Sequence, residues 1–437
     1  MSAATLPSPI SAQASSSRPS RSTSSRSRAA STSTLKRSNG STKSTSEATV
    51  KEGTSASGST PPVPNRQTYR TVPKLPEGDV EECPPTMMYW SKAPVYGTIP
   101  RRGLKCHTVT LVDNTAWMFG GTNLISSSSS AVETPEAGCW DEVYTFDTDT
   151  MQWGHPLMHG DLPPPSKGHT ATQIERRMFV FGGGRGTQYY DTLYYLDPLY
   201  RKWTLVTYPE GAIKPSARRS HAAAAKGSKL YIFGGGTGGT ALNDLWCIDL
   251  TKIDNRNGHV RWEKIDVQGD KPPARGYASM CIVQHHIIIY GGSSRGEFQS
   301  SDMWIRNADL STWHEIQAPG GAPRAAHSCV QVGSCLFIFG GLLREDSGDG
   351  FVLFNLVTLS WEALPTRGTP PPGTRAFHQC ILVDGRMFII GGLEGRKLQH
   401  DVYILDLATY AYYPQVTNFD INLNPPLEQE EVSSNYF

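Results

Sequence analysis

An apolar run that ends in a pair of glycines occurs six times in this chain, and this repetition limits the possible folds more than any other feature. The pairs are Gly120-Gly121, Gly182-Gly183, Gly234-Gly235, Gly291-Gly292, Gly340-Gly341 and Gly391-Gly392. The intervals between successive first glycines are 62, 52, 57, 49 and 51 residues. One glycine-rich loop after an apolar strand is weak support for phosphate binding, whereas six at one period predict a repeat architecture.

Other positions follow the glycines in register. Thirteen residues before each first glycine stand His107, His169, His221, Ala278, His327 and His378. An aromatic-rich segment follows each pair, and a tryptophan comes after it in five of the units, as Trp153, Trp203, Trp262, Trp313 and Trp361. The apolar runs are β-branched or aromatic and are bounded by Gly, Pro, Asn or Asp, which is typical of short strands. Each unit therefore predicts four strands, here called a, b, c and d, with b ending at the glycines.

A single four-stranded sheet cannot bury both of its faces, but six sheets arranged radially can pack on one another. The predicted fold is therefore all-β, a six-bladed propeller over residues 87–416. In this fold the glycines at the end of strand b would adopt positive φ and let neighbouring backbones approach closely.

These registered positions resemble the kelch repeat, in which an apolar run, Gly-Gly, a following aromatic and a tryptophan recur at fixed distances. The resemblance covers residues 87–416 and implies a kelch β-propeller. Three positions depart from the pattern: Ala278 replaces a histidine, Gly350-Phe351 replaces the usual Asp of strand c, and Tyr412 replaces a tryptophan.

Closure of the ring has two candidate strands. The segment "WSKAPVYGTIPRRG" at 90–103 matches the d-to-a connection "WHEIQAPGGAPRAA" at 313–326. We therefore expect residues 87–92, with Trp90, to supply strand d of the last blade. Residues 410–416 are the alternative. Joining distant segments would remove an exposed edge from the ring.

The N-terminal part differs in composition from the rest. Residues 1–66 are rich in Ser, Thr, Ala and Arg and hold nine basic and two acidic residues, a net charge of 9 − 2 = +7, which leaves 1 − 7 = −6 for the remainder. So few apolar residues cannot offset the chain entropy lost on folding, and we expect a disordered basic tail. A mitochondrial targeting sequence is the rival interpretation. Residues 67–86 are expected to be a linker, and 417–437 an acidic flexible tail. Ser31 and Thr60 are candidate phosphorylation sites.

The sequence gives no support for catalysis. It has no GxSxG, HExxH or GxxxxGK[ST] motif, and its eight cysteines form no CxxC pair. We expect free thiols, no cofactor and no metal site. Histidines from different blades stand too far apart to share a zinc ion, so a structural role for them is expected.

No apolar run is long enough to span a bilayer and no secretory signal is visible, which favours the cytoplasm, with the cell cortex and the nucleus left open.

A set of basic residues is the candidate partner-binding site. Strand polarity places the d-to-a connections and the b-to-c loops on one face of a propeller, and most of the basic residues occupy one repeat position or stand next to it. They are Arg101, Arg102, Lys167, Arg218, Arg219, Arg275, Arg324 and Arg375. Guanidinium groups around a concavity would suit an acidic or phosphorylated segment of another protein. The alternative is that each arginine pairs locally at its turn. Nucleic acid is not expected, because the body is net acidic.

The leading hypothesis is thus a non-enzymatic interaction scaffold or adaptor that uses the loop face of a kelch propeller. A low-complexity basic front followed by a propeller resembles fungal kelch proteins of cell polarity and small-GTPase signalling. The alternative is a small-molecule enzyme, an oxidase or an isomerase, with its site at the channel mouth.

Overall fold

The computed structural model describes residues 87–125, 138–253, 260–294, 300–307, 312–343 and 350–408, together with Phe419, Ile421 and Leu423. The predicted tail and linker, Ser31, Thr60 and residues 410–416 lie outside the described residues. Regular structure in the described part consists of strands, without an α-helix. A search of the same residues finds no helix with the length and hydropathy needed to cross a membrane.

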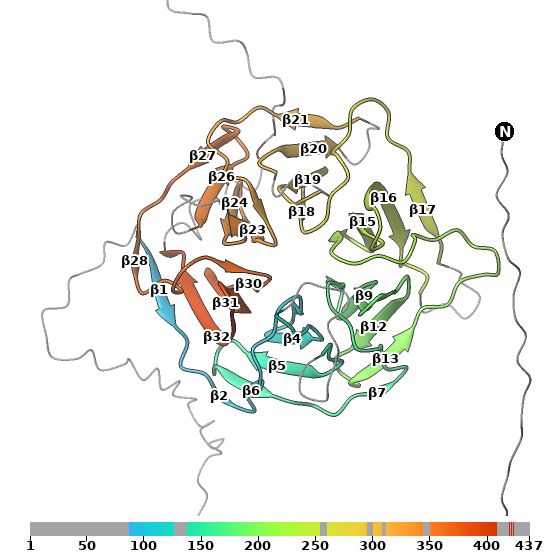
Figure 1. Ribbon diagram of the computed structural model, residues 1–437, viewed down its shortest axis with the longest axis horizontal. Coiled ribbons are helices and arrows are strands. Elements are labelled where there is room, and N and C mark those ends of the chain that lie inside the picture. Colours follow the sequence, from blue (N-terminus) through green and yellow to red (C-terminus); the bar gives the residue numbers. More distant parts are fainter. Residues whose placement is uncertain are drawn as a thin grey trace, which may run out of the picture. The chain divides into compact units, whose positions relative to one another are not determined.

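Six sheets stand around a central channel, as Figure 1 shows, which confirms the predicted six-bladed propeller. In each blade, strand a lies nearest the channel and strand d lies at the rim. Neighbouring blades cover both faces of each b-strand. This is why the b-strands are uninterrupted apolar runs. The run Leu230–Phe233 illustrates this, since all four side chains are buried.

The strands of the six blades are as follows. Blade 1 holds β3 (Thr108–Val112), β4 (Thr115–Phe119), β5 (Val143–Asp147) and β6 (Gln152–Gly154). Blade 2 holds β8 (Thr170–Ile174), β9 (Arg177–Phe181), β12 (Leu193–Asp197) and β13 (Lys202–Leu205). Blade 3 holds β14 (Ala222–Lys226), β15 (Lys229–Gly236), β16 (Ala241–Asp249) and β17 (Trp262–Ile265). Blade 4 holds β18 (Ser279–Val283), β19 (His286–Tyr290), β20 (Met303–Asn307) and β21 (His314–Ile316). Blade 5 holds β23 (Ser328–Val332), β24 (Cys335–Phe339), β26 (Phe351–Asn355) and β27 (Ser360–Glu362). Blade 6 holds β30 (Gln379–Val383), β31 (Arg386–Glu394), β32 (Lys397–Asp406) and β1 (Met88–Lys92).

Short strands extend this frame. At the rim, β2 (Tyr96–Gly97), β7 (His159–Gly160) and β28 (Thr366–Gly368) pair in parallel with β6, β13 and β1. Each belongs to a d-to-a connection that runs along the outer strand of the next blade. Near the channel, β22 (Arg324–Ala325) pairs with β25 (Leu342–Leu343), β29 (Arg375–Ala376) with β31, and β10 (Gly184–Arg185) with β11 (Gln188–Tyr189).

The N-terminal strand closes the ring. Strand β1 pairs antiparallel with β32, with Tyr89 opposite Asp406 and Lys92 opposite Tyr403. Figure 1 shows this blue strand at the outer edge of the orange-red blade 6. The prediction that residues 87–92 supply the last strand d is therefore confirmed. Blade 6 has no open edge on the side of β32, because β1 covers it and β28 covers β1 in turn.

Tryptophans on the d-strands join each blade to the one before it. Trp203 of blade 2 lies 5.2 Å, between ring centroids, from Phe119 of blade 1, and Trp262 of blade 3 lies 5.1 Å from Phe181 of blade 2. Trp90 repeats the contact at the closure, 5.2 Å from Phe339 of blade 5. The N-terminal strand thus occupies the same packing position as the other d-strands. The tryptophans of the repeat are buried, apart from the half-buried Trp361.

The glycine pairs hold neighbouring blades together, as predicted. All twelve glycines have positive φ, between 63° and 103°. The second glycine of each pair donates its N–H to the next blade, and Gly121 to the Ser166 carbonyl at 2.8 Å is one of six such bonds. A Cβ on the first glycine would collide with that blade as well, since the one built on Gly120 lies 2.8 Å from Cε1 of His169. These glycines therefore serve the packing of the ring.

The packed part of the chain extends beyond the predicted boundary at residue 416. Phe419 and Ile421 fall within the expected flexible C-terminal tail, yet both are buried against blades 4 and 5. The apolar residues at 419, 421 and 423 alternate with polar ones, a strand-like pattern that the acidic composition further along the tail obscured. The described cysteines are free thiols.

Candidate functional site at the channel mouth

A closed ring of backbone hydrogen bonds forms one mouth of the channel. Each blade contributes one residue, which donates its N–H to the carbonyl of its counterpart in the preceding blade, at 2.6 to 3.1 Å. The members, in ring order, are Cys106, Gly168, Ser220, Tyr277, Ala326 and Phe377. All six have φ between 56° and 65°, a left-handed conformation that costs free energy for five of them because they are not glycine. The ring fixes the position of the residues on either side of it.

The residue before each ring member pairs with the start of the b-to-c loop in its own blade. Lys105 pairs with Thr122, Lys167 with Gly184 and Arg219 with Gly236. In blades 4, 5 and 6 the corresponding residues are Gly276, Ala325 and Ala376. Basic side chains therefore stand on one half of the mouth and small residues on the other. Lys105, Lys167 and Arg219 are called the basic triad below.

The three cations of the triad act on the same surroundings. Burial lowers the pKa of Lys105, and the charge of Lys167 lowers it further. Burial raises the pKa of the Cys106 thiol to about 11, and Lys105, Lys167 and Arg219 all oppose that rise. Among the described residues no carboxylate forms an ion pair with any member of the triad. The triad therefore leaves positive charge at the mouth that an anionic group would neutralise.

A cavity of about 290 Å³ opens beside Arg219. The Arg219 guanidinium stacks on Tyr189, with its carbon 4.8 Å from the ring centroid. The hydroxyl-bearing residues Tyr277 and Ser293 line the cavity together with the glycine-rich end of β15. A cation stacked on an aromatic ring, with hydroxyl and backbone groups around it, is suited to hold a carboxylate or phosphate.

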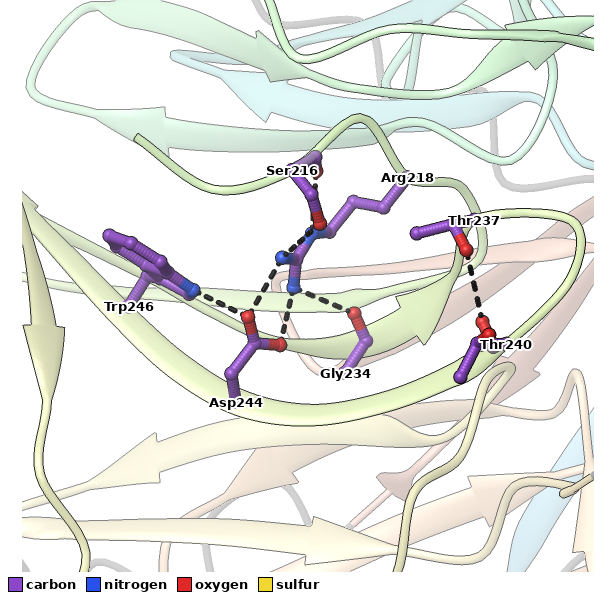
Figure 2. A network of polar contacts seen from close by, with 7 residues as sticks. All are labelled: Ser216, Arg218, Gly234, Thr237, Thr240, Asp244 and Trp246. Atoms are coloured by element: carbon purple, nitrogen blue, oxygen red, sulfur yellow. Dashed lines mark hydrogen bonds and ion pairs between the residues drawn. The ribbon is translucent and has the colours of Figure 1, made fainter. Parts of the chain in front are cut away.

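Four arginines predicted to bind a partner lie inside the blades, and this corrects their expected role. Arg218, Arg324 and Arg375 are 0% exposed and Arg275 is 3% exposed, so a ligand at the mouth cannot reach their guanidinium groups. Figure 2 shows Arg218, which donates to both carboxylate oxygens of Asp244, at 2.7 and 2.9 Å, and to the Gly234 carbonyl at 3.1 Å. The alternative considered for the sequence, local pairing at each turn, describes them correctly.

The other buried arginines repeat this arrangement with different acceptors. Arg275 and Arg375 pair with Asp302 and Asp401, at 2.6 and 2.7 Å. Arg324 donates to the carbonyl of Gly350, at 2.7 Å, because blade 5 has glycine where blades 3, 4 and 6 have aspartate. Each arginine thereby ties the start of strand a to the end of b and the start of c. Their repeat position predicted their neighbourhood correctly but not their burial.

The remaining four predicted residues divide between two places. Lys167 and Arg219 stand at the mouth as expected. Arg101 and Arg102 are exposed beside a separate cavity of about 150 Å³, where the Arg102 guanidinium lies 4.2 Å from the Trp140 ring centroid. Sequence reasoning missed Lys105. The signal was present, because Lys105 precedes a ring member just as Lys167 and Arg219 do.

The histidines line the channel wall in a structural role, as expected. His169 and His221 hydrogen-bond through Nε2 to Thr108 and Thr170 of the preceding blades, at 2.9 and 2.8 Å. His327 and His378 bond to Ser279 and Ser328 in the same way, both at 2.8 Å. Burial lowers the pKa of His107 to about 4 and those of His169, His221 and His378 to about 3. No group of three or more metal-ligating side chains occurs among the described residues.

Comparison with known proteins agrees with this architecture. The model of the KLHDC2/KLHL20/DRC7 Kelch-repeats domain matches residues 106–341 and 322–433. Host cell factor of Drosophila melanogaster is 28% identical over 334 residues, covering 68% of this chain and 21% of the relative. Host cell factor 1 of Homo sapiens is 27% identical and is covered over 15% of its length. The leucine-zipper-like transcriptional regulator 1 homolog of Drosophila melanogaster is 24% identical over 323 residues, covering 70% of this chain and 31% of the relative. The chain thus spans less than a third of each of these relatives.

Proposed function

The chain belongs to the KLHDC2/KLHL20/DRC7 Kelch-repeats domain family, and we propose that it is a non-enzymatic interaction module whose channel mouth binds an acidic segment of a partner protein. The observation that carries the proposal is the basic triad, three cations on one half of the mouth that pair with no carboxylate among the described residues. The body as a whole is net acidic, so this positive patch would select where an acidic segment docks.

The basic residues at the mouth would contribute to binding in different ways. Arg219, held against Tyr189, can present a fixed fork of donors to a carboxylate or phosphate. Lys167 adds a flexible point charge. The buried Lys105 would raise the positive electrostatic potential at the mouth without touching the ligand. Arg101 and Arg102 form a second basic spot that a longer segment would reach.

Charge reversal at the mouth tests the proposal. A fluorescein-labelled octapeptide of alternating Glu and Ser is the probe, and a Gln/Ser octapeptide is its neutral counterpart. We expect Lys167→Glu with Arg219→Glu to weaken binding of the acidic peptide at least tenfold at low salt. The matched control is Lys202→Glu with Lys229→Glu. These two exposed lysines are the first residues of β13 and β15, next to turns on the opposite face of the propeller. Equal binding by all three proteins, or equal binding of the two peptides, would refute the proposal.

The narrower biological assignments are also proposals. A role in cell polarity or small-GTPase signalling, in the cytoplasm or at the cell cortex, rests on the resemblance of a basic front and a propeller to fungal kelch proteins. The test is to identify the proteins that bind the wild type and do not bind the variant with Lys167→Glu and Arg219→Glu. The competing function is a small-molecule oxidase or isomerase at the same mouth. Stoichiometric copper or iron in purified protein would favour that enzyme.

A further inference from the structure

The chain beyond its last strand returns to the ring. Because β1 completes blade 6, the residues after β32 are not needed as its strand d. Phe419 and Ile421 are instead 9% and 7% exposed, and Leu423 is half-buried. All three pack into a single hydrophobic cluster with residues of blades 4 and 5.

The contact lies at the interface of blades 4 and 5, on the face opposite the channel mouth. The cluster includes Val283 and Ile305 of blade 4 and Leu336 and Leu356 of blade 5. The side-chain amide of Gln284, in the turn between β18 and β19, donates to the Phe419 carbonyl. This turn joins strands a and b, so it stands at the end of the blade away from the basic triad. We call the surface formed by these residues the 4/5 groove.

The apolar residues stand at every second position, the spacing of an extended segment that presents one side to a surface. Phe419, Ile421 and Leu423 stand at alternate positions, and Asp420 and Asn422 separate them in the sequence. In extended backbone, alternate side chains point the same way, which brings three apolar groups onto one surface. The contacts of the three described residues are side-chain burial in this cluster and the hydrogen bond from Gln284 to the Phe419 carbonyl.

The 4/5 groove differs from the other blade interfaces. The remaining five hydrophobic clusters in the described part of the chain consist only of blades and their connections, within residues 88–407. Among the described residues, this cluster alone includes residues beyond 407.

We propose that the 4/5 groove is a docking site for a short extended segment with large apolar side chains at alternate positions, and that residues 419–423 are its resident ligand in cis. A partner segment with the same alternation would bind by displacing the resident one. The tether gives the resident segment a high effective concentration, so competition from outside requires its release. This second surface is independent of the channel mouth and of the charge of its ligand.

A peptide in trans tests the proposal on the full chain. The probe is a fluorescein-labelled peptide with the sequence of residues 417–424, TNFDINLN. The variant Phe419→Ser with Ile421→Ser vacates the groove, and Leu427→Ser is a control that changes an apolar residue further along. We expect the peptide to bind the double variant at least tenfold more tightly than the wild type or the control. A peptide with Ser at both anchor positions should not bind.

Further outcomes decide the proposal in either direction. Adding Gln284→Ala to the double variant should weaken peptide binding several-fold. Failure of the peptide to bind a folded double variant would show that residues 419–423 are a fixed part of the core. Equal binding to wild type and variant would place the peptide elsewhere, and a wild-type dimer held by exchanged segments would overturn docking in cis. If the double variant does not fold, faster amide exchange at 419–423 in Gln284→Ala than in wild type supports the site, and unchanged exchange refutes it.

Discussion

His169 of blade 2 shares a 2.9 Å hydrogen bond with Thr108 of blade 1, and the same pair of positions forms this bond at four of the six blade interfaces. Four interfaces hold a histidine and a hydroxyl. At the interface of blades 3 and 4 both partners are replaced together, by Ala278 and Ala222. Loss of one partner alone would leave a buried polar group unsatisfied, which is costly, whereas loss of both is nearly neutral.

This pairing predicts the effect of restoring the missing bridge. We expect Ala222→Thr and Ala278→His together to be more stable than the sum of the two single changes, by about 1 kcal/mol. Urea unfolding of the four proteins in this cycle measures the coupling. Strict additivity would mean that no bridge forms.

Acid should destabilise the ring through its buried histidines. Their folded-state pKa values, about 3 to 4 for four of the five, lie below the ordinary value of 6.5, so between these limits the unfolded chain binds more protons than the folded one. Stability is therefore full above pH 6.5 and is lost as pH falls below it, by about 1.4 kcal/mol per histidine at pH 5.5. Chemical unfolding at pH 7.5 and 5.5 measures the loss. In His378→Asn this loss of stability should be smaller by the contribution of one histidine. An unchanged loss would show that His378 is not one of the groups responsible.

The buried ion pair of blade 4 should be essential for stability. Arg275→Met removes the cation that pairs with the Asp302 carboxylate and donates to the Gly291 carbonyl, at a cost of about 3 kcal/mol in the free energy of unfolding. The matched control is Arg176→Met, because the Arg176–Asp113 pair has the similar distance of 2.7 Å but exposed side chains. That change should cost less than about 1 kcal/mol. Equal effects of the two variants would argue against the role of burial.

The N-terminal strand should matter as much as any other strand d. Trp90 is 1% exposed and packs on Phe339 and Phe351, so Trp90→Ala should lower the free energy of unfolding by about 3 to 5 kcal/mol. Its neighbour Tyr89, 47% exposed, supplies the control Tyr89→Ala, which should have little effect. Thermal unfolding distinguishes the two. A mild effect of Trp90→Ala would mean that β1 is dispensable for closure.

The repeated positions predicted the fold in detail because each has a physical role that recurs in every blade. Gly120 and its counterparts need positive φ, and Trp203 and its counterparts fill the gap between blades. Even the closing strand could be predicted, because Trp90 stands at the same distance from its Pro-Arg pair as Trp313 does.

The binding site was predicted less well, because sequence position does not show the direction of a side chain. Arg218 and Arg219 are adjacent, yet one lies inside the blade on Asp244 and the other stacks on Tyr189 at the mouth. The carboxylate that pairs with Arg218 is 26 residues away along the chain, and only the folded sheet brings the two together. Composition likewise concealed Phe419 and Ile421, whose burial depends on a groove formed by two distant blades.

Closure by β1 also sets an order of events during synthesis. Tyr89 pairs with Asp406, a separation of 406 − 89 = 317 residues, so the first of the described strands to be made must wait for the last of them. At roughly 5 to 20 residues per second, Met88 and Trp90 wait on the order of 15 to 60 seconds for the strand that will cover them. During that interval five blades can assemble while an apolar strand stays available to chaperones or to a wrong neighbour. The circle becomes a single cooperative unit only once β32 has been made.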